Sequence, residues 1–179
     1  MTKEHFDKKG VPAYTGEKAM VPSLTRLIEV IRASRQNLLF DGATDEDLAT
    51  LEQRLGKPLP PSFEQFLRET DGALLYQSEE IFGTKDNGVE DNREGLRTSI
   101  PTALEAIGEN HKLPVKLPVQ LIPFSEGGSI LYFDATSGEN NEHAVVRWVP
   151  EENKIEPVSP SFSDWLYTHV VREHSGTVR

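Results

Sequence analysis

Histidine and serine residues are where this sequence offers catalytic or metal-binding chemistry, since imidazoles and activated hydroxyls carry many general-base and nucleophilic steps. His5, His111 and His174 stand among polar residues, and nothing near His143 in the sequence completes a metal triad. His169 falls on the apolar side of a helical repeat, where a histidine more often packs than catalyses. His169 and His174 are five positions apart, which misses the i, i+4 spacing of a helical metal pair. We therefore expect no histidine catalyst and no histidine metal site.

The segment Gly127-Gly128-Ser129-Ile130-Leu131 comes nearest to a nucleophile motif. A nucleophile elbow needs G-x-S-x-G between a strand and a helix, whereas here the closing glycine is missing and a strand follows. A phosphate loop is also excluded, because no helix N-terminus and no Lys-Ser/Thr pair follow the glycines. A hairpin turn explains the segment. The chain has no cysteine, which excludes thiol catalysis, thiolate metal sites and disulfides.

Clustered carboxylates are the remaining candidate for metal chemistry. Asp86-Asn87-Gly88, followed by Glu90 and Asp91, faintly resembles a calcium loop. Its oxygen ligands do not alternate as in an EF-hand, and its glycine arrives three positions too early. A solvated acidic loop is the better interpretation. We expect neither a metal nor a cofactor.

The net charge of −10 is concentrated in one part of the chain. Between Asp41 and Glu94 there are 14 acidic and 5 basic residues, a local charge of −9. Nucleic-acid binding needs Lys and Arg to neutralise phosphates, so direct DNA or RNA binding is disfavoured. A basic protein partner would be attracted instead, although solubility alone explains such a charge equally well.

The length and composition fit an ordinary globular domain. Of 179 residues, 36% are hydrophobic and 27% are charged. No apolar run approaches the ~20 residues that span a bilayer, and residues 1–20 contain no apolar signal segment. We expect a cytoplasmic protein that does not bind membranes. Residues 21–174 are predicted to form one domain, with residues 1–20 and 175–179 as tails.

The elements that would position any site begin with three helices. Leu24, Leu27, Ile28 and Ile31 repeat at helical spacing. Thr44 with Asp47 then predicts a capped helix that ends at Gly56, and Pro60-Pro61 predicts the start of another that Asp71-Gly72 closes. A short helix is expected at 102–109. A last helix begins at a Ser161-x-x-Asp164 box, and its apolar face contains Phe162, Trp165, Leu166, His169 and Val170.

Between these helices the apolar period becomes strand-like. Short strands are expected at 73–76 and 80–84, and clearer ones at 119–124, 129–135, 143–149 and 154–158. The loops 125–128 and 137–142 are short enough for hairpins, which predicts an antiparallel meander. Helices followed by a meander and a covering helix indicate an α+β fold.

The order of residues in 51–72 resembles the SMI1/KNR4 (SUKH) superfamily, whose signature is E-x-x-LG-x-x-LP-x-x-aromatic-x-x-FL-x-x-x-(N/D)-G. The later segments 130–134, 145–149 and 161–166 are similar to the family's strands and final Ser-Phe helix. The residues that carry the resemblance are Glu52, Leu55, Gly56, Leu59, Pro60, Phe63, Phe66, Leu67, Asp71, Gly72, Phe162, Trp165 and Leu166. Their spacing is typical of core positions, so we expect them to be structural.

The resemblance implies helices packed on a mostly antiparallel twisted sheet and a binding module without catalytic residues. Bacterial members are largely immunity proteins that neutralise a co-encoded toxin by direct binding, and fungal members are regulators of cell-wall synthesis and signalling. The small size favours the immunity type, with a cognate and basic toxin such as a nuclease. A regulatory scaffold that binds a host protein, with no toxin, is the alternative; a hydrolase using Asp71 or Asp134 is a third.

Recognition is expected in the acidic loops and on the exposed sheet surface, because variable loops usually decide partner choice. The residues predicted to contact the partner are Glu79, Glu80, Asp86, Glu90, Asp91 and Asp134. The oligomeric state does not follow from the sequence.

Overall fold

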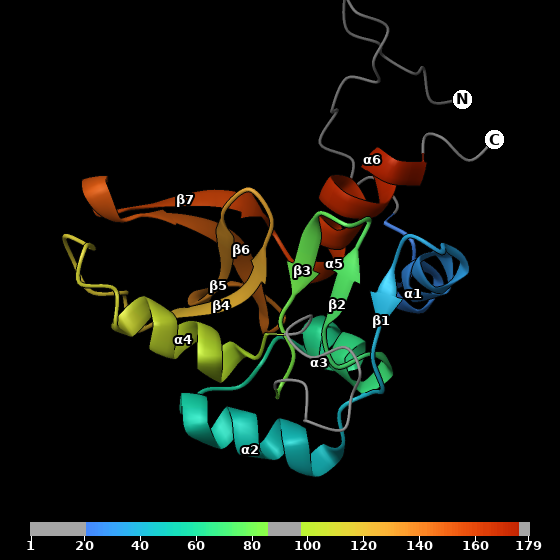
Figure 1. Cartoon of the computed structure of the whole chain (residues 1–179), viewed down its shortest axis with the longest axis horizontal. Helices are drawn as coiled ribbons and strands as arrows, with labels where there is room; N and C mark the ends of the chain where they lie inside the picture. Colours follow the sequence, from blue (N-terminus) through green and yellow to red (C-terminus); the bar gives the residue numbers. More distant parts are fainter. Residues whose placement is uncertain (1–20, 86–97, 176–179) are drawn as a thin grey trace, which may run out of the picture.

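The described strands form one seven-stranded antiparallel sheet whose spatial order is the order along the chain (Figure 1). The computed structural model describes residues 21–85 and 98–175. The meander predicted for the later strands is confirmed, and it extends to β1–β3, since every strand pairs with its neighbours in sequence. Its strands are β1 (Leu38–Leu39), β2 (Ala73–Leu75), β3 (Glu79–Ile81), β4 (Leu121–Glu126), β5 (Ile130–Glu139), β6 (Glu142–Val149) and β7 (Lys154–Ser159).

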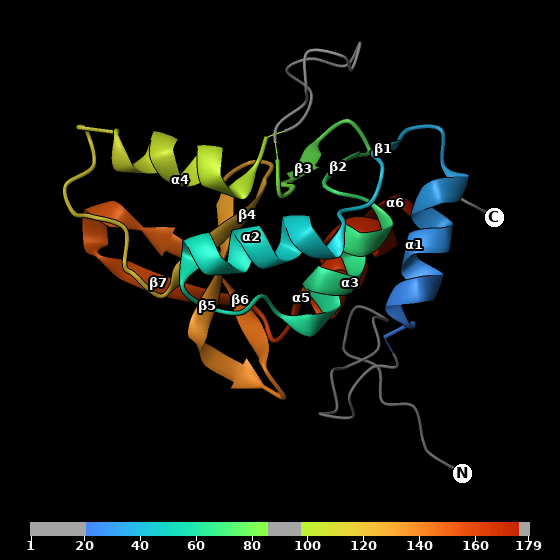
Figure 2. The same ribbon diagram turned by 90° about the horizontal axis from the view of Figure 1, so that it is seen from below.

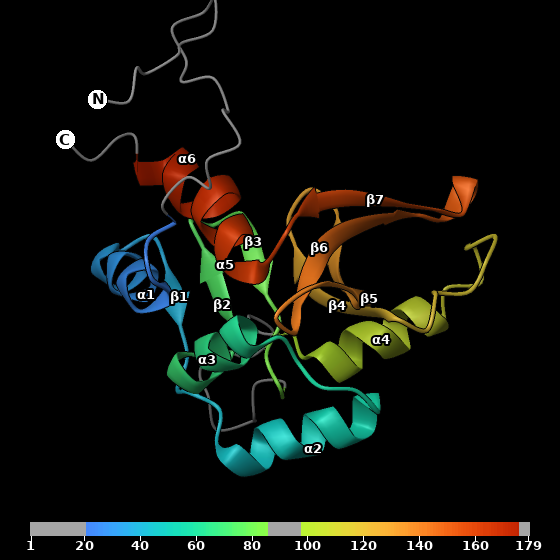
Figure 3. The same cartoon turned by 180° about the vertical axis from the view of Figure 1, so that it is seen from behind.

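Helices lie on both sides of this sheet, which confirms the α+β class (Figures 2 and 3). The first three precede β2, α4 precedes β4, and the last helical segments follow β7. They are α1 (Leu24–Ala33), α2 (Asp45–Leu55), α3 (Pro61–Glu69), α4 (Ile100–Gly108), the 3-10 turn η1 (Pro150–Glu152), α5 (Phe162–Trp165), the π-helical segment η2 (Leu166–Val171) and α6 (Arg172–Ser175).

Side chains along the central strands alternate between the two faces of the sheet, and the buried ones form two clusters. Phe124, Phe133 and Val145 belong to the main core with α1, α3 and α5. Tyr132 and Trp148 belong to a smaller cluster with Ile107 of α4. Successive strand side chains point to opposite faces, so the two clusters lie on opposite sides of the sheet. Both faces of β4–β6 are therefore apolar.

Local sequence fixes most helix starts. The Ser23, Ser99 and Ser161 hydroxyls each accept a hydrogen bond from the first turn of the helix that follows. Thr44 and Asp47 form the predicted reciprocal capping box, with N···O distances of 2.9 and 3.1 Å.

The third helix begins differently, because Pro60 offers no capping side chain. Glu142 of β6, eighty positions away, takes that role: its carboxylate accepts the Ser62 N–H at 2.9 Å and the Ser62 hydroxyl at 2.6 Å. The start of α3 is thus fixed by the β5–β6 hairpin.

Several predicted boundaries were wrong. Helix α3 ends at Glu69, and the extended Thr70, not the Asp71-Gly72 pair, is its C-terminal cap. The strands β5 and β6 run through the expected loop 137–142 and leave only Asn140-Asn141, both at positive φ, as the turn. Strand β1 was not predicted at all, since two residues are too few to show a period.

The last helix also departs from its predicted face. Phe162, Trp165, Leu166 and Val170 are buried as expected, but His169 is exposed. The cause is the π-helical segment, whose wider turns rotate the side chains and bury Val170 with Val171. His174, predicted to lie in a polar tail, instead stacks on the Tyr76 ring with a centroid distance of 4.1 Å.

Candidate functional site

The predicted partner-binding acids that the structure describes do not form one patch. Glu79 accepts a hydrogen bond from the Ser125 hydroxyl, and Glu80 accepts one from the Thr98 N–H at 2.7 Å. Asp134 accepts the N–H and hydroxyl of Thr136 at 2.9 and 2.6 Å. All three acids are half-buried.

Their separation follows from the strand registers. Glu80 pairs with Glu126 and Asp134 pairs with Leu121, at opposite ends of β4. At about 3.3 Å per residue, their backbone positions are separated along β4 by on the order of 15 Å. The other predicted contacts, Asp86, Glu90 and Asp91, lie outside the described residues.

Most signature residues of 51–72 are buried, and several of them join elements. Phe63 is fully buried, with centroid distances of 5.0 Å to Phe133 and 5.1 Å to Phe162. Glu52 accepts the Leu59 N–H at 3.0 Å, which ties α2 to the segment before α3. Gly56 ends α2 in the left-handed region at φ 67°.

The Asp71-Gly72 pair marks a close approach between two chain segments. Asp71 is fully buried and accepts two hydrogen bonds from Thr84. Gly72 has φ 89°, and a Cβ there would lie 2.9 Å from the Ile81 carbonyl oxygen. A Cβ on Gly83 would lie 2.6 Å from the Asp71 carbonyl oxygen. The pair therefore serves packing, because only glycine fits this crossing without strain.

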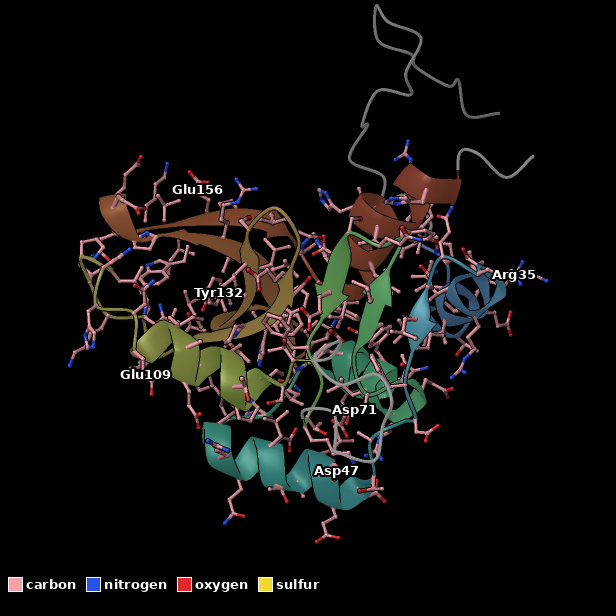
Figure 4. All side chains as sticks on the ribbon, in the orientation of Figure 1. Arg35, Asp47, Asp71, Glu109, Tyr132 and Glu156 are labelled. Carbon is pink, nitrogen blue, oxygen red and sulfur yellow. The ribbon has the colours of Figure 1, made fainter. Side chains whose placement is uncertain are left out.

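A pocket of about 470 Å³ lies between α4 and strands β4–β6, on the sheet face opposite the main core. In Figure 4, Tyr132 lies between α4 and the strands, and Glu109 lies at the end of α4. Apolar side chains form most of its wall: Ala103, Ile107, Leu113, Ile130, Tyr132 and Trp148. A concave and mainly apolar wall of this kind is suited to hold a ligand or an anchoring side chain.

The aromatic wall of the pocket contains an unsatisfied polar atom. Tyr132 and Trp148 meet edge to face, with centroids 6.3 Å apart. Trp148 is 7% exposed, and its indole Nε1 is buried without a hydrogen-bond partner in the described parts of the chain. Leaving a buried donor unpaired costs about 1–3 kcal/mol, so such atoms often mark a place where an acceptor binds.

The pocket lining contains one acidic and one basic side chain, Glu126 and Arg147. Glu126 is exposed and has no ion-pair partner in the described ranges. Burial, with the negative charge of Glu126 as a second cause, raises the pKa of Tyr132 to about 12. Glu109 at the end of α4 and Glu151 beside Pro150 are exposed acids close in sequence to lining residues. Arg147 is the lining cation, and its guanidinium lies 3.9 Å from Glu156.

Within the described ranges no three His, Cys, Asp or Glu side chains gather in a way that could hold a metal ion. His143 is buried, with its Nε2 3.1 Å from the Pro58 carbonyl oxygen, and so links β6 to the segment before α3. No described helix is both long and apolar enough to cross a membrane.

Sequence reasoning missed this pocket. The signal was present: Tyr132, Val146 and Trp148 are apolar at strand positions that face away from the main core. Apolar residues on both faces of a strand indicate that something covers each face. The helix that was predicted at 102–109 packs on this face of the sheet. Its contact with the sheet does not follow from its own sequence.

Comparisons with known proteins agree with this fold. One solved structure, a crystal structure of a protein from Pseudomonas syringae pv. tomato, is 20% identical and superposes with a TM-score of 0.53. The match covers 83% of this chain and 96% of the other, and at this identity it shows the fold alone. A comparison with curated proteins gives no match. The sequence model of the SMI1 / KNR4 family (SUKH-1) matches residues 42–168, well over half of the chain. This chain therefore belongs to the SMI1/KNR4 family (SUKH-1).

Proposed function

We propose that this chain is an immunity protein that binds a cognate toxin directly and covers its active site. Membership of a family that often acts through protein binding carries the proposal. Within the described residues no group of His, Cys, Asp or Glu side chains could hold a metal ion, and most signature side chains are used in packing. What the surface offers a partner is a half-open apolar pocket and acidic side chains.

The charge of the chain supports a basic partner. The net charge is −10, and the exposed acids Glu109, Glu126, Glu151 and Glu152 have no ion-pair partner in the described ranges. Nuclease toxins bind phosphate-rich substrates and therefore carry positive charge. Opposite charges would speed their association with this chain, and apolar anchors would slow dissociation.

The decisive experiment uses the toxin encoded beside this chain in its native genome. The purified toxin domain is titrated with the full chain, while binding is followed by calorimetry and toxin activity by substrate turnover. We expect a stoichiometric complex and loss of toxin activity at one equivalent. A neighbouring toxin that neither binds nor is inhibited would contradict the proposal.

The same experiment separates the regulatory alternative. A scaffold of the regulatory type would have no adjacent toxin gene, and its partner would be a host protein whose own activity changes on binding. Capture of such a protein from the host, together with absence of toxin inhibition, would favour that role instead.

A further inference from the structure

We propose that the pocket beneath α4 is the anchor site for the partner, and that it takes one apolar side chain carried on a Lys/Arg-rich segment of that protein. This inference rests on the proposed function and adds the place and chemistry of contact. Three observations carry it: the shape of the pocket, the unpaired indole of Trp148, and the exposed carboxylate of Glu126 in the lining, which has no ion-pair partner within the described ranges.

The pocket is shaped for a side chain. Its volume of about 470 Å³ is within the range of roughly 300–1,000 Å³ that encloses small molecules, so a large aliphatic or aromatic group fits with part of its backbone. The wall is mainly apolar, and Tyr132 and Trp148 present aromatic surface to it. Buried aromatic pockets of this kind are where interface energy concentrates.

The Trp148 indole requires a hydrogen-bond acceptor from the group that binds in the pocket. Its Nε1 is a donor only, and no acceptor in the described residues serves it. A peptide segment brings backbone carbonyl oxygens beside its anchor side chain. A small rotation of the indole toward such a carbonyl would pair the Nε1 donor. A purely hydrocarbon ligand would leave that donor unpaired.

The exposed carboxylate of Glu126 favours a basic segment, as does the net charge of −10. Glu126 lines the pocket, while Glu109 and Glu151 flank it in sequence, and none of them has an ion-pair partner within the described ranges. Arg147, the lining cation, is already near Glu156. An acidic segment would be repelled, whereas Lys or Arg on either side of the anchor would pair with these carboxylates.

A phage-displayed library of random dodecapeptides, panned on the immobilised full chain, tests the proposal. Two plugging variants and one charge variant are compared. Ala106→Trp places a bulky ring in the pocket from α4, and Ser129→Trp does so from the β4–β5 hairpin should the first fail to fold. Ala49→Trp, on the exposed face of α2, is the matched control.

We expect the selected peptides to share one large apolar residue flanked by Lys or Arg. They should bind the wild type and Ala49→Trp equally, and Ala106→Trp or Ser129→Trp at least tenfold more weakly. Glu126→Gln should weaken binding several-fold at low salt, and the difference should close at high salt. Glu46→Gln, an exposed acid on α2 without an ion-pair partner in the described ranges, should leave binding unchanged.

Nuclear magnetic resonance locates the contact. The indole N–H resonance of Trp148, assigned with Trp148→Phe, should move on addition of a selected peptide, while that of the core residue Trp165 stays in place. Selection of acidic or uncharged peptides, equal binding to the plugged variants, or an unmoved Trp148 resonance would overturn the proposal.

The toxin separates this inference from the proposed function. If toxin is neutralised equally well by the wild type and by the plugged variants, the anchor site is wrong and the immunity role stands. If no toxin is neutralised but the peptides bind as expected, the immunity role is wrong and the anchor site stands.

Discussion

The carboxylate of Asp71 accepts two hydrogen bonds from Thr84, at 2.6 Å from the backbone nitrogen and 2.7 Å from the hydroxyl oxygen. Asp71 follows α3 and Thr84 follows β3, so this pair joins two segments that enclose the main core. The aspartate of the family signature therefore has a structural role, although an aspartate in such a motif can suggest catalysis.

Asp71→Ala should lower the free energy of unfolding by roughly 2–4 kcal/mol, because it removes two charge-assisted hydrogen bonds and leaves the partly buried Thr84 without their acceptor. Asp71→Asn should cost less, since its amide oxygen still accepts one bond. Urea unfolding followed by circular dichroism measures both. A loss below about 0.5 kcal/mol for Asp71→Ala would show that the pair contributes little to stability.

The capping box of α2 should make the free energy of unfolding depend on pH. The Thr44 N–H is the largest cause, with Lys85 assisting, of a pKa for Asp47 that is lower than usual. A lowered folded pKa gives stability that is present above the ordinary value of 3.8 and is lost as pH falls through the folded pKa. Asp47→Ala should therefore cost about 1 kcal/mol at neutral pH and clearly less in strong acid.

The main elements could be predicted from sequence because their information is local. Thr44 with Asp47 and Ser161 with Asp164 begin helices by contacts within one turn, and both were identified. The start of α3 was not explained, since its cap is Glu142, which only the folded sheet brings near Ser62. Pairing of sequence neighbours made the meander predictable as well.

The candidate site could not be predicted, because its contacts, like the cap of α3, join residues that are distant in the sequence. Its walls come from α4, from three strands and from the turn at Pro150, and no local period joins them. Asp134 and Glu80 were grouped with each other as exposed acids, but the strand register places them at opposite ends of β4. Glu126, which lines the pocket, was not predicted, because an exposed strand-end acid looks like any other in sequence.

The long-range cap of α3 gives a further prediction. Glu142→Ala should lower the free energy of unfolding by about 1–2 kcal/mol, because the Ser62 N–H and hydroxyl lose their acceptor at a helix start. Ser62→Ala should cost less, since the backbone N–H still finds the carboxylate. In a double-mutant cycle the two changes should couple by at least about 0.5 kcal/mol. Strict additivity would mean that the contact does not stabilise the fold.

Exposed acids near the pocket should govern how fast a basic toxin associates. Replacing Glu151 and Glu152 together by Lys should slow association several-fold at low salt and leave dissociation nearly unchanged, since rim charges act mainly on encounter. The same reversal at Asp41 and Glu46 is the control for net charge. Stopped-flow measurements at two salt concentrations test this. Equal slowing by both pairs would show that total charge, and not its position, sets the rate.

The raised pKa of Tyr132 should make the free energy of unfolding depend on pH in alkaline solution. Burial, aided by the charge of Glu126, raises the pKa of this phenol from 10.0 to about 12. The unfolded chain releases the proton first, so the stability that this group contributes is complete below pH 10.0 and is lost as pH rises through about 12. The free energy of unfolding should therefore fall more steeply across this interval in the wild type than in Tyr132→Phe. Glu126→Gln should lower the pKa of Tyr132, which phenolate absorbance reports. Identical pH profiles for wild type and Tyr132→Phe would place the phenol in water and contradict a buried aromatic wall.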